Sequence, residues 1–210
     1  MMLSWIPEIG WPHVGLSLLI GYLLGTIPFG LLFAFAFGAG DVRKIGSGSI
    51  GATNVLRTGK YAAAALTLLF DALKGVASVL ITRHFFGEDA ALFAAFAAFA
   101  GHLFPVWLRF KGGKGIAVSL GILLAISWPV GLIAFASWGV VLAAFRISSL
   151  SALAAAVLTP VYMYLFHRIH ETELAVLLAV LVFIAHRENI ARLLAGTEPK
   201  VGGSKSAATS

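Results

Sequence analysis

The chain has 210 residues, of which 60% are hydrophobic and only 11% are charged, and its formal net charge at pH 7 is +6. This composition, with a mean hydropathy of +0.95, excludes a water-soluble enzyme and predicts a polytopic membrane protein. The absence of cysteine also excludes disulfides, thiolate catalysis and cysteine metal sites.

Seven apolar segments predict an all-α bundle of seven transmembrane helices. They lie at about residues 11–38, 61–82, 90–108, 116–128, 130–145, 149–166 and 174–185. Only Trp128 and Pro129 separate the fourth segment from the fifth, so one long broken helix is the alternative. Residues 1–196 then form a single transmembrane domain, and the small polar residues of 197–210 predict a disordered tail. We expect the first segment to be retained, because the N-terminus lacks the basic stretch of a signal peptide.

The distribution of loop charges favours seven spans over six. With seven spans, one side of the membrane receives most of the basic loop residues, and the other side receives only Arg83 and Arg168. The positive-inside rule therefore places the N-terminus outside and the C-terminus in the cytoplasm. Because the basic residues are spread over short loops between apolar spans, we expect anionic lipid or anionic substrates as partners, and no nucleic acid.

The first polar cluster is residues 44–57, KIGSGSIGATNVLR. It matches G-x-G-x-x-G and, apart from Ala52 in place of lysine, a Walker A loop, but no strand precedes it and Ala52 cannot reach a phosphate. Its glycines still allow positive φ and close approach of backbone amides to an anion. A flexible loop with a helix cap at Ser49 or Thr53 explains the residues equally well. The candidate phosphate-binding residues of this cluster are Gly46, Ser47, Gly48, Ser49, Thr53, Asn54 and Arg57.

The second cluster is residues 101–117, GHLFPVWLRFKGGKGIA, at the end of the third segment. Lys111 and Lys114 alternate with glycines directly before the fourth segment, and lysines beside a helix N-terminus favour phosphate. Anchoring of the loop to the cytoplasmic side explains the lysines but does not call for Gly112 and Gly113.

The third cluster is residues 186–196, HRENIARLLAG. If the helix continues, His186 and Asn189 lie on one face with Arg187 beside them. A lone histidine and asparagine at a membrane boundary are usually plain interfacial residues, but three polar clusters on one side weaken that interpretation.

Two further features are interpreted structurally. Asp71 and Lys74 lie one helical turn apart in an apolar span, where ionised groups are paired or functional; we expect a structural ion pair that supports the site, with a catalytic role as the alternative. Residues 84–89, HFFGED, match the H-x4-D pattern of another class of glycerolipid acyltransferases. They fall on the opposite side from the three clusters, so we interpret them as an outer loop.

Together the three clusters resemble the acyl-phosphate-dependent glycerol-3-phosphate acyltransferases of bacteria, the PlsY family. The resemblance extends to TIPFG at residues 26–30 and DALKG at residues 71–75. One position departs from the family pattern: most members have asparagine where this chain has Ser49, which keeps a hydroxyl but lacks the amide. The resemblance implies a multi-pass protein of the bacterial cytoplasmic (inner) membrane, with its N-terminus outside and its active site facing the cytoplasm. The implied reaction transfers an acyl group from acyl phosphate to the 1-hydroxyl of glycerol 3-phosphate, giving lysophosphatidic acid and inorganic phosphate.

Acyl phosphate is an activated anhydride, so the reaction requires no covalent nucleophile, metal ion or other cofactor. Cations would clamp the two phosphates, while His186 and Asn189 orient the attacking hydroxyl or the carbonyl. Either His186 or a substrate phosphate, whose second pKa is about 6, could accept the proton. The expected catalytic residues are Ser47, Arg57, Lys114, His186 and Asn189. The expected substrate-binding residues are Gly46, Gly48, Ser49, Thr53, Asn54, His102, Lys111, Gly112, Gly113 and Arg187.

The alternative function is a small membrane transporter for a phosphate-bearing anionic solute, and a structural or lipid-binding protein is a third possibility. The sequence does not determine the acyl-chain preference or the oligomeric state. A transporter needs polar groups near the middle of the membrane, whereas only Asp71 and Lys74 lie deep in a predicted span. The distribution of polar residues therefore favours an enzyme at one membrane surface.

Overall fold

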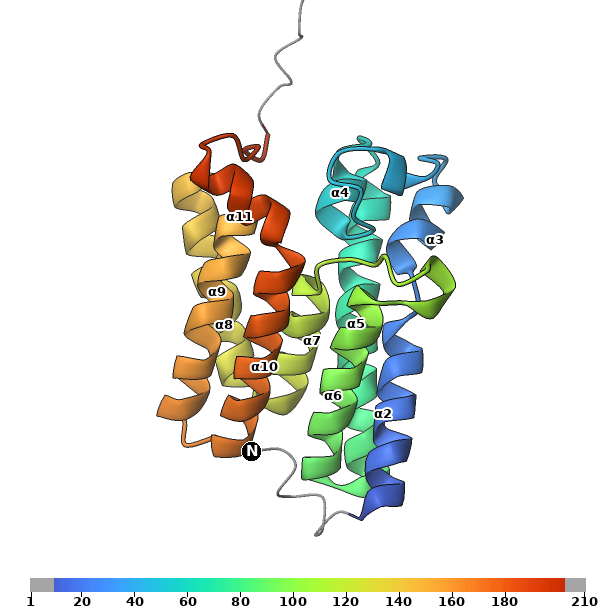
Figure 1. Ribbon diagram of the computed structural model, residues 1–210, viewed down its shortest axis with the longest axis vertical. Helices are drawn as coiled ribbons and strands as arrows, with labels where there is room; N and C mark the ends of the chain where they lie inside the picture. Colours follow the sequence, from blue (N-terminus) through green and yellow to red (C-terminus); the bar gives the residue numbers. More distant parts are fainter. Residues whose placement is uncertain (1–9, 203–210) are drawn as a thin grey trace, which may run out of the picture.

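The computed structural model describes residues 10–202, and over that range it contains helices and no strand (Figure 1). Short 3-10 turns at η2 (Val42–Lys44) and η3 (Val106–Leu108) accompany the α-helices. The α-helices are α2 (Trp11–Gly25), α3 (Phe29–Ala36), α4 (Ala52–Leu56), α5 (Tyr61–Phe86), α6 (Glu88–Leu103), α7 (Ile116–Ile126), α8 (Trp128–Phe145), α9 (Ser148–Leu165), α10 (Ile169–Ala185) and α11 (Arg187–Leu194).

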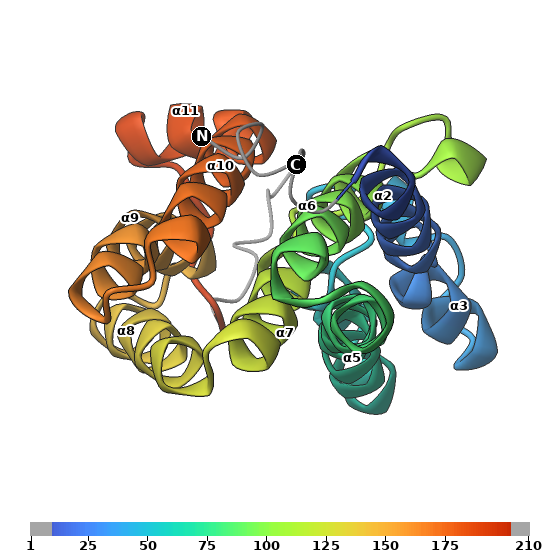
Figure 2. The ribbon, with the colours of Figure 1, turned by 90° about the horizontal axis from the view of Figure 1, so that it is seen from below.

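Each predicted apolar segment coincides with a helix or a broken helix. Five helical stretches are long and apolar enough to cross a membrane, α10 with α11 forms a sixth that is bent by 64°, and α7 is a shorter apolar helix. Helices α7 and α8 lie side by side with only Ser127 between them, so the alternative of one long broken helix is wrong (Figure 2). Seven crossings with the N-terminus outside stay a prediction.

Close packing of α2 on α6 depends on glycines in both helices. A Cβ atom at Gly21 or Gly25 would overlap the α6 backbone at Ala94 or Ala98, and one at Gly101 would overlap the carbonyl of Tyr22. Small residues let helix backbones approach closely, which is how membrane helices gain van der Waals contact. The alanine-rich α6 is accordingly the most buried of the long helices.

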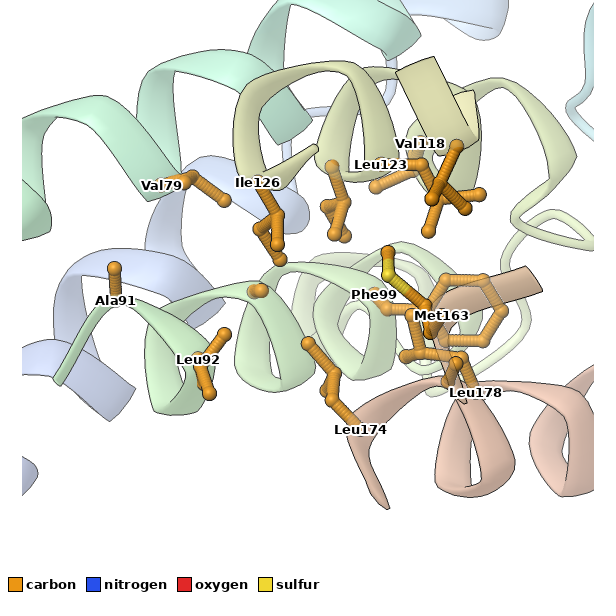
Figure 3. Close-up of a cluster of buried hydrophobic side chains, with 14 of the residues drawn as sticks. Val79, Ala91, Leu92, Phe99, Val118, Leu123, Ile126, Met163, Leu174 and Leu178 are labelled. Carbon is orange, nitrogen blue, oxygen red and sulfur yellow. The ribbon is translucent and has the colours of Figure 1, made fainter. Parts of the chain in front are cut away.

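The larger hydrophobic core joins α6 to the helices on its other side. Phe99 of α6, Val118 of α7, Met163 of α9 and Leu178 of α10 meet there, and all four side chains are buried (Figure 3). This core fixes the beginning of α7 and the end of α10 relative to the end of α6. These are the three points from which the second and third polar clusters depart.

Arginines satisfy the carbonyls at the far end of α7. Arg83 of α5 donates to the carbonyl of Ala125 at 2.9 Å, and Arg168 donates to that of Ile126 at 3.3 Å. The last carbonyls of a helix have no partner within it, so these contacts cap α7 from outside. The cap lies opposite the end that carries α4 and α11, which we call the α4–α11 end (Figure 1).

The structure differs from the sequence prediction at the start of the tail. Residues 197–202 lie against the bundle: the backbone of Val201 donates to the carbonyl of Arg146 at 2.7 Å, and Glu198 bonds to three side chains. Disorder was expected because the segment contains few apolar residues, but here polar contacts hold it. Residues 1–9 and 203–210 lie outside the described residues.

Candidate active site

The three polar clusters lie at the same end of the bundle, the α4–α11 end (Figure 1). The Nζ of Lys114, from the second cluster, donates a 2.5 Å hydrogen bond to the Oδ1 of Asn189, from the third. Arg57, from the first cluster, is close enough to lower the pKa of Lys114 by repulsion. The structure thus brings together one predicted catalytic residue from each cluster.

Asn54 organises the first loop from within. Its side-chain amide donates to the carbonyls of Val42, Ile45 and Ser49, and its Oδ1 accepts from the backbone of Ser47 at 3.1 Å. The side chain is buried and its polar atoms are occupied by the loop. Asn54, predicted to bind phosphate, instead shapes the loop 44–57.

The glycines of the first loop behave as predicted at two positions. Gly46 and Gly48 have φ of 54° and 68°, whereas Gly51 is extended and forms the N-cap of α4 in place of the predicted Ser49 or Thr53. A Cβ at Gly46 would overlap the guanidinium of Arg57, so this guanidinium lies directly over the glycine turn.

Backbone hydrogen bonds tie the second loop to the end of α6. Gly112 donates to the carbonyl of Leu103, and Gly113 donates to that of His102, each at 3.0 Å. A Cβ at Gly112 would overlap the carbonyl of His102, and one at Gly113 would overlap the His102 ring. Gly115, with φ of 81°, forms the N-cap of α7. Tight packing against α6 explains these glycines, which membrane anchoring alone did not.

Lys114 is half-buried at the beginning of α7. Burial lowers the pKa of this lysine, Glu198 and Glu188 oppose that shift, and Arg192 and Arg57 add to it. A cation whose charge is this poorly solvated gains strongly from an anionic ligand. The surroundings of Lys114 therefore favour an anionic ligand.

His102 does not belong to the phosphate-binding surface predicted for it. Its ring is 3% exposed, and its Nδ1 lies 2.9 Å from the Nζ of Lys74. The pattern GHLFP placed it close in sequence to Lys111, but the helical turn of α6 directs its ring into the bundle. His102 supports the second loop from below.

The third cluster forms where α10 bends into α11. His186 occupies the bend, and its Nδ1 lies 2.8 Å from the carbonyl of Val182, so the proton is on Nδ1 and the Nε2 lone pair is free. Burial lowers the pKa of His186 to about 4; the bond to Val182 and the charge of Glu198 oppose the shift, and Lys114 adds to it. The imidazole is thus neutral and able to accept a hydrogen bond at Nε2 near neutral pH.

Glu198 is a site residue that the sequence interpretation missed. Its carboxylate accepts from the amide of Asn189 at 2.5 Å and from Ser149 and Arg192 at 2.7 Å. Burial alone would raise the pKa of Glu198, but these three hydrogen bonds lower it. A carboxylate only accepts, so it turns the Asn189 Nδ2 toward itself and the Oδ1 toward Lys114. An acid just after HRENIARLLAG was the available signal.

Other predicted residues lie at the edge of the site. Thr53, Lys111 and Arg187 are exposed, and within residues 10–202 no hydrogen bond joins them to the Lys114–Asn189 pair. Asp71 and Lys74 are buried and in contact at 2.8 Å, as expected of a structural ion pair.

An apolar cavity of about 170 Å³ lies among the helices. Its lining comes from α7, α8, α9 and α10, with Leu68 of α5. Two lining residues lie close to the polar groups: Ile116 lies two residues after Lys114, and the carbonyl of Val182 bonds to His186. The residues that give it its shape include Ile116, Leu120, Trp138, Ala156, Leu178 and Val182.

The glycerol-3-phosphate acyltransferase family model matches residues 15–196. A glycerol-3-phosphate acyltransferase of Mesorhizobium japonicum is 58% identical over 187 residues, which cover 89% of this chain and 95% of the relative. One of Dinoroseobacter shibae is 55% identical and covers 91% and 96%. The chain belongs to the glycerol-3-phosphate acyltransferase family.

A solved structure supports the same assignment. The glycerol 3-phosphate form of PlsY (YgiH), an integral membrane glycerol 3-phosphate acyltransferase, has a TM-score of 0.85 and 35% identity, covering 90% of this chain and 96% of that one. Its lysophosphatidic acid form has a TM-score of 0.83. This chain is therefore an integral membrane acyltransferase with the all-helical fold that the sequence predicted, and the transporter alternative is set aside.

Proposed function

We propose that this glycerol-3-phosphate acyltransferase takes its acyl group from acyl phosphate and releases lysophosphatidic acid and inorganic phosphate. The observation that supports this most directly is the Lys114–Asn189 pair, which lies within electrostatic range of Arg57 and two residues before Ile116, part of the lining of the apolar cavity. Two phosphates and one fatty chain must meet in such a reaction. Cations close to an apolar cavity can bind the phosphates while the cavity takes the fatty chain.

In the proposed reaction the 1-hydroxyl oxygen of glycerol 3-phosphate attacks the acyl carbonyl carbon. The new ester C–O bond forms, the bond between the acyl carbon and the phosphate oxygen breaks, and phosphate leaves with the electron pair. Arg57 and Lys114 neutralise the charge of the two phosphates, with Ser47, Ser49, the loop amides and Lys111 completing the surface. Because the leaving group is already activated, positioning and charge neutralisation suffice.

The proton of the attacking hydroxyl has two possible acceptors. The free Nε2 of His186 can accept a hydrogen bond from the hydroxyl, but a histidine with a pKa of about 4 is a weak base. A phosphate monoester, with a second pKa of about 6, is the stronger base at neutral pH. We propose that His186 orients the hydroxyl and that a substrate phosphate oxygen takes the proton.

The apolar cavity is the proposed site of the acyl chain. Its lining is almost wholly aliphatic and aromatic, and it lies among helices that the sequence places in the membrane. The proposed location is the bacterial inner membrane, with the α4–α11 end in the cytoplasm, where glycerol 3-phosphate is soluble.

The test is an assay of the purified protein in detergent with acyl phosphate and glycerol 3-phosphate. We expect equal amounts of inorganic phosphate and monoacyl product, and neither above background when glycerol 3-phosphate is omitted. A parallel reaction with acyl-CoA tests the donor, and product formed only from acyl-CoA would contradict the proposal.

A further inference from the structure

The buried side chain of Lys74 contacts three separate parts of the bundle. Its Nζ lies 2.8 Å from Asp71 Oδ1, donates to the carbonyl of Ile27 at 2.8 Å, and lies 2.9 Å from His102 Nδ1. It also lies 5.8 Å from the centre of the Phe29 ring. An ion pair alone needs one partner, so these additional contacts call for an explanation.

The contact with Ile27 holds the break between α2 and α3. Pro28 interrupts the helix, and the carbonyl of Ile27, which lies outside both helices, accepts from the backbone of Phe29 at 3.1 Å as well as from Lys74. Irregular backbone in a membrane must find its hydrogen bonds within the protein, and Lys74 provides one. Lys74 therefore ties α5 to the break from which α3 starts at Phe29.

Helix α3 in turn supports the first phosphate-binding loop. A Cβ at Gly30 would overlap the carbonyl of Ile50, so the first turn of α3 lies directly against residues 44–57. A displacement of α3 at the break would move this loop with it.

The contact with His102 supports the second loop. An ammonium group only donates, so His102 Nδ1 accepts and the ring proton is on Nε2. That Nε2 edge faces Gly113, because a Cβ at Gly113 would overlap it, and the backbone of Gly113 bonds to the carbonyl of His102. The position of residues 111–115, including Lys114, therefore depends on how Lys74 holds this ring.

We propose that Lys74 is a positioning residue that fixes the spacing between the loops 44–57 and 111–115, and so between Arg57 and Lys114; this rests on the proposed function. One ammonium group contacts the support of each loop. Removing the ammonium group frees the two loops to move relative to each other. This weakens the clamp, because Arg57 and Lys114 must contact the substrate phosphates at the same time.

The test compares Lys74→Met/Asp71→Val with the wild-type protein. Replacing a buried ion pair with apolar residues of similar volume usually preserves stability, so we expect a Tm close to that of the wild type. The kcat/KM for glycerol 3-phosphate should fall at least tenfold, because the contacts with Ile27 and His102 are lost. If the pair is purely structural, the double variant should match the wild type in both Tm and kcat/KM. A kcat/KM of the double variant within twofold of the wild-type value would therefore overturn the proposal.

If the double variant does not fold, His102→Phe tests the Lys74–His102 contact by changing its other partner. It keeps the Asp71–Lys74 pair and a ring of similar size but removes the acceptor, so the same loss of kcat/KM is expected at a similar Tm. Ser17→Ala is the matched control, since it removes a buried side-chain hydrogen bond, to the carbonyl of His13 in the first half of α2, and should leave kcat/KM unchanged.

Calorimetric binding of inorganic phosphate separates this proposal from the proposed function. The variants at Lys74 and His102 should bind phosphate at least tenfold more weakly than the wild type, whether or not acyl transfer occurs. A wild-type protein that binds phosphate but forms no product refutes the proposed function alone. Equal phosphate binding by wild type and variants refutes the positioning role.

Discussion

Arg57 and Lys114 are the two cations that we expect single substitutions to show as indispensable. Arg57→Ala and Lys114→Ala should each lower kcat/KM at least a hundredfold, as deletion of a group that stabilises developing charge does. Lys60→Ala, which removes an exposed lysine after the first loop, is the control and should remain near wild type. Release of inorganic phosphate, measured with one substrate saturating and the other varied, gives these values. Near-normal turnover in both variants would refute the clamp.

His186 gives a prediction for the dependence on pH. Its pKa is lowered to about 4, mainly by burial. The imidazole therefore stays neutral at pH 6 and becomes protonated only as the pH falls toward 4. Both the wild type and His186→Ala should therefore share an acidic limb near pH 6 in kcat/KM, from the substrate phosphate, and differ only in height. Profiles from pH 5 to 8.5 check this, and loss of that limb in His186→Ala would make His186 the base.

Residue types alone could identify the candidates but not their orientation. Arg57, Lys114 and Asn189 were predicted and do converge, because their chemistry and side of the membrane can be read from spacing and charge. Asn54 and His102 were predicted to bind phosphate and instead face inward. Which way a polar side chain turns depends on partners distant in sequence, here the loop carbonyls and Lys74.

Among the larger elements, the loop 111–115 depends on its contact with α6. Gly113→Ala should lower kcat/KM at least tenfold, because its Cβ would displace the His102 ring and move Lys114. Gly139→Ala in α8 is the matched control, since a Cβ there meets nothing and alanine favours a helix by about 1 kcal/mol. Steady-state kinetics with Tm measurements distinguish the two, and unchanged kinetics in Gly113→Ala would contradict the close fit.

The segment after α11 gives a second prediction at this scale. Glu198→Gln should lower kcat/KM about tenfold, because hydrogen bonds to a charged group contribute roughly 1.5–3 kcal/mol and the Asn189 amide loses its fixed orientation. Glu188→Gln, an exposed acid on α11, should have little effect. Equal activity of the two variants would reduce Glu198 to a surface contact. The prediction of disorder for this segment was based on its low content of apolar residues. It took no account of the hydrogen bonds that the Glu198 carboxylate accepts.

At the scale of the whole molecule, α7 explains why Lys114 is partly buried. Eleven residues of helix extend about 16 Å, roughly half of a 30 Å hydrocarbon layer. With its far end capped by Arg83 and Arg168, the near end of α7 stops inside the bundle, and the loop 109–115 occupies the remaining depth. Helix order was predictable from the apolar segments, whereas this depth depends on where α7 is capped.

The proposed topology can be tested because the chain has no native cysteine. Single cysteines at the exposed positions Lys60, Lys111 and Arg187 should react with an impermeant maleimide only from the cytoplasmic side, and one at His84 only from outside. Labelling of intact and inverted vesicles measures this. Reaction of the first three from different sides would make a shared active site impossible.

The apolar cavity has a consequence for traffic through the enzyme. Phe135, which is half exposed, is part of its lining, so the cavity adjoins an exposed flank of α8, which the sequence predicts to face lipid. Bringing a fatty tail into water costs about 0.8 kcal/mol for each methylene group, and a lateral route avoids that barrier both on arrival and on departure. Glycerol 3-phosphate and the released inorganic phosphate would exchange with the cytoplasm, while acyl phosphate and lysophosphatidic acid would stay in the membrane leaflet.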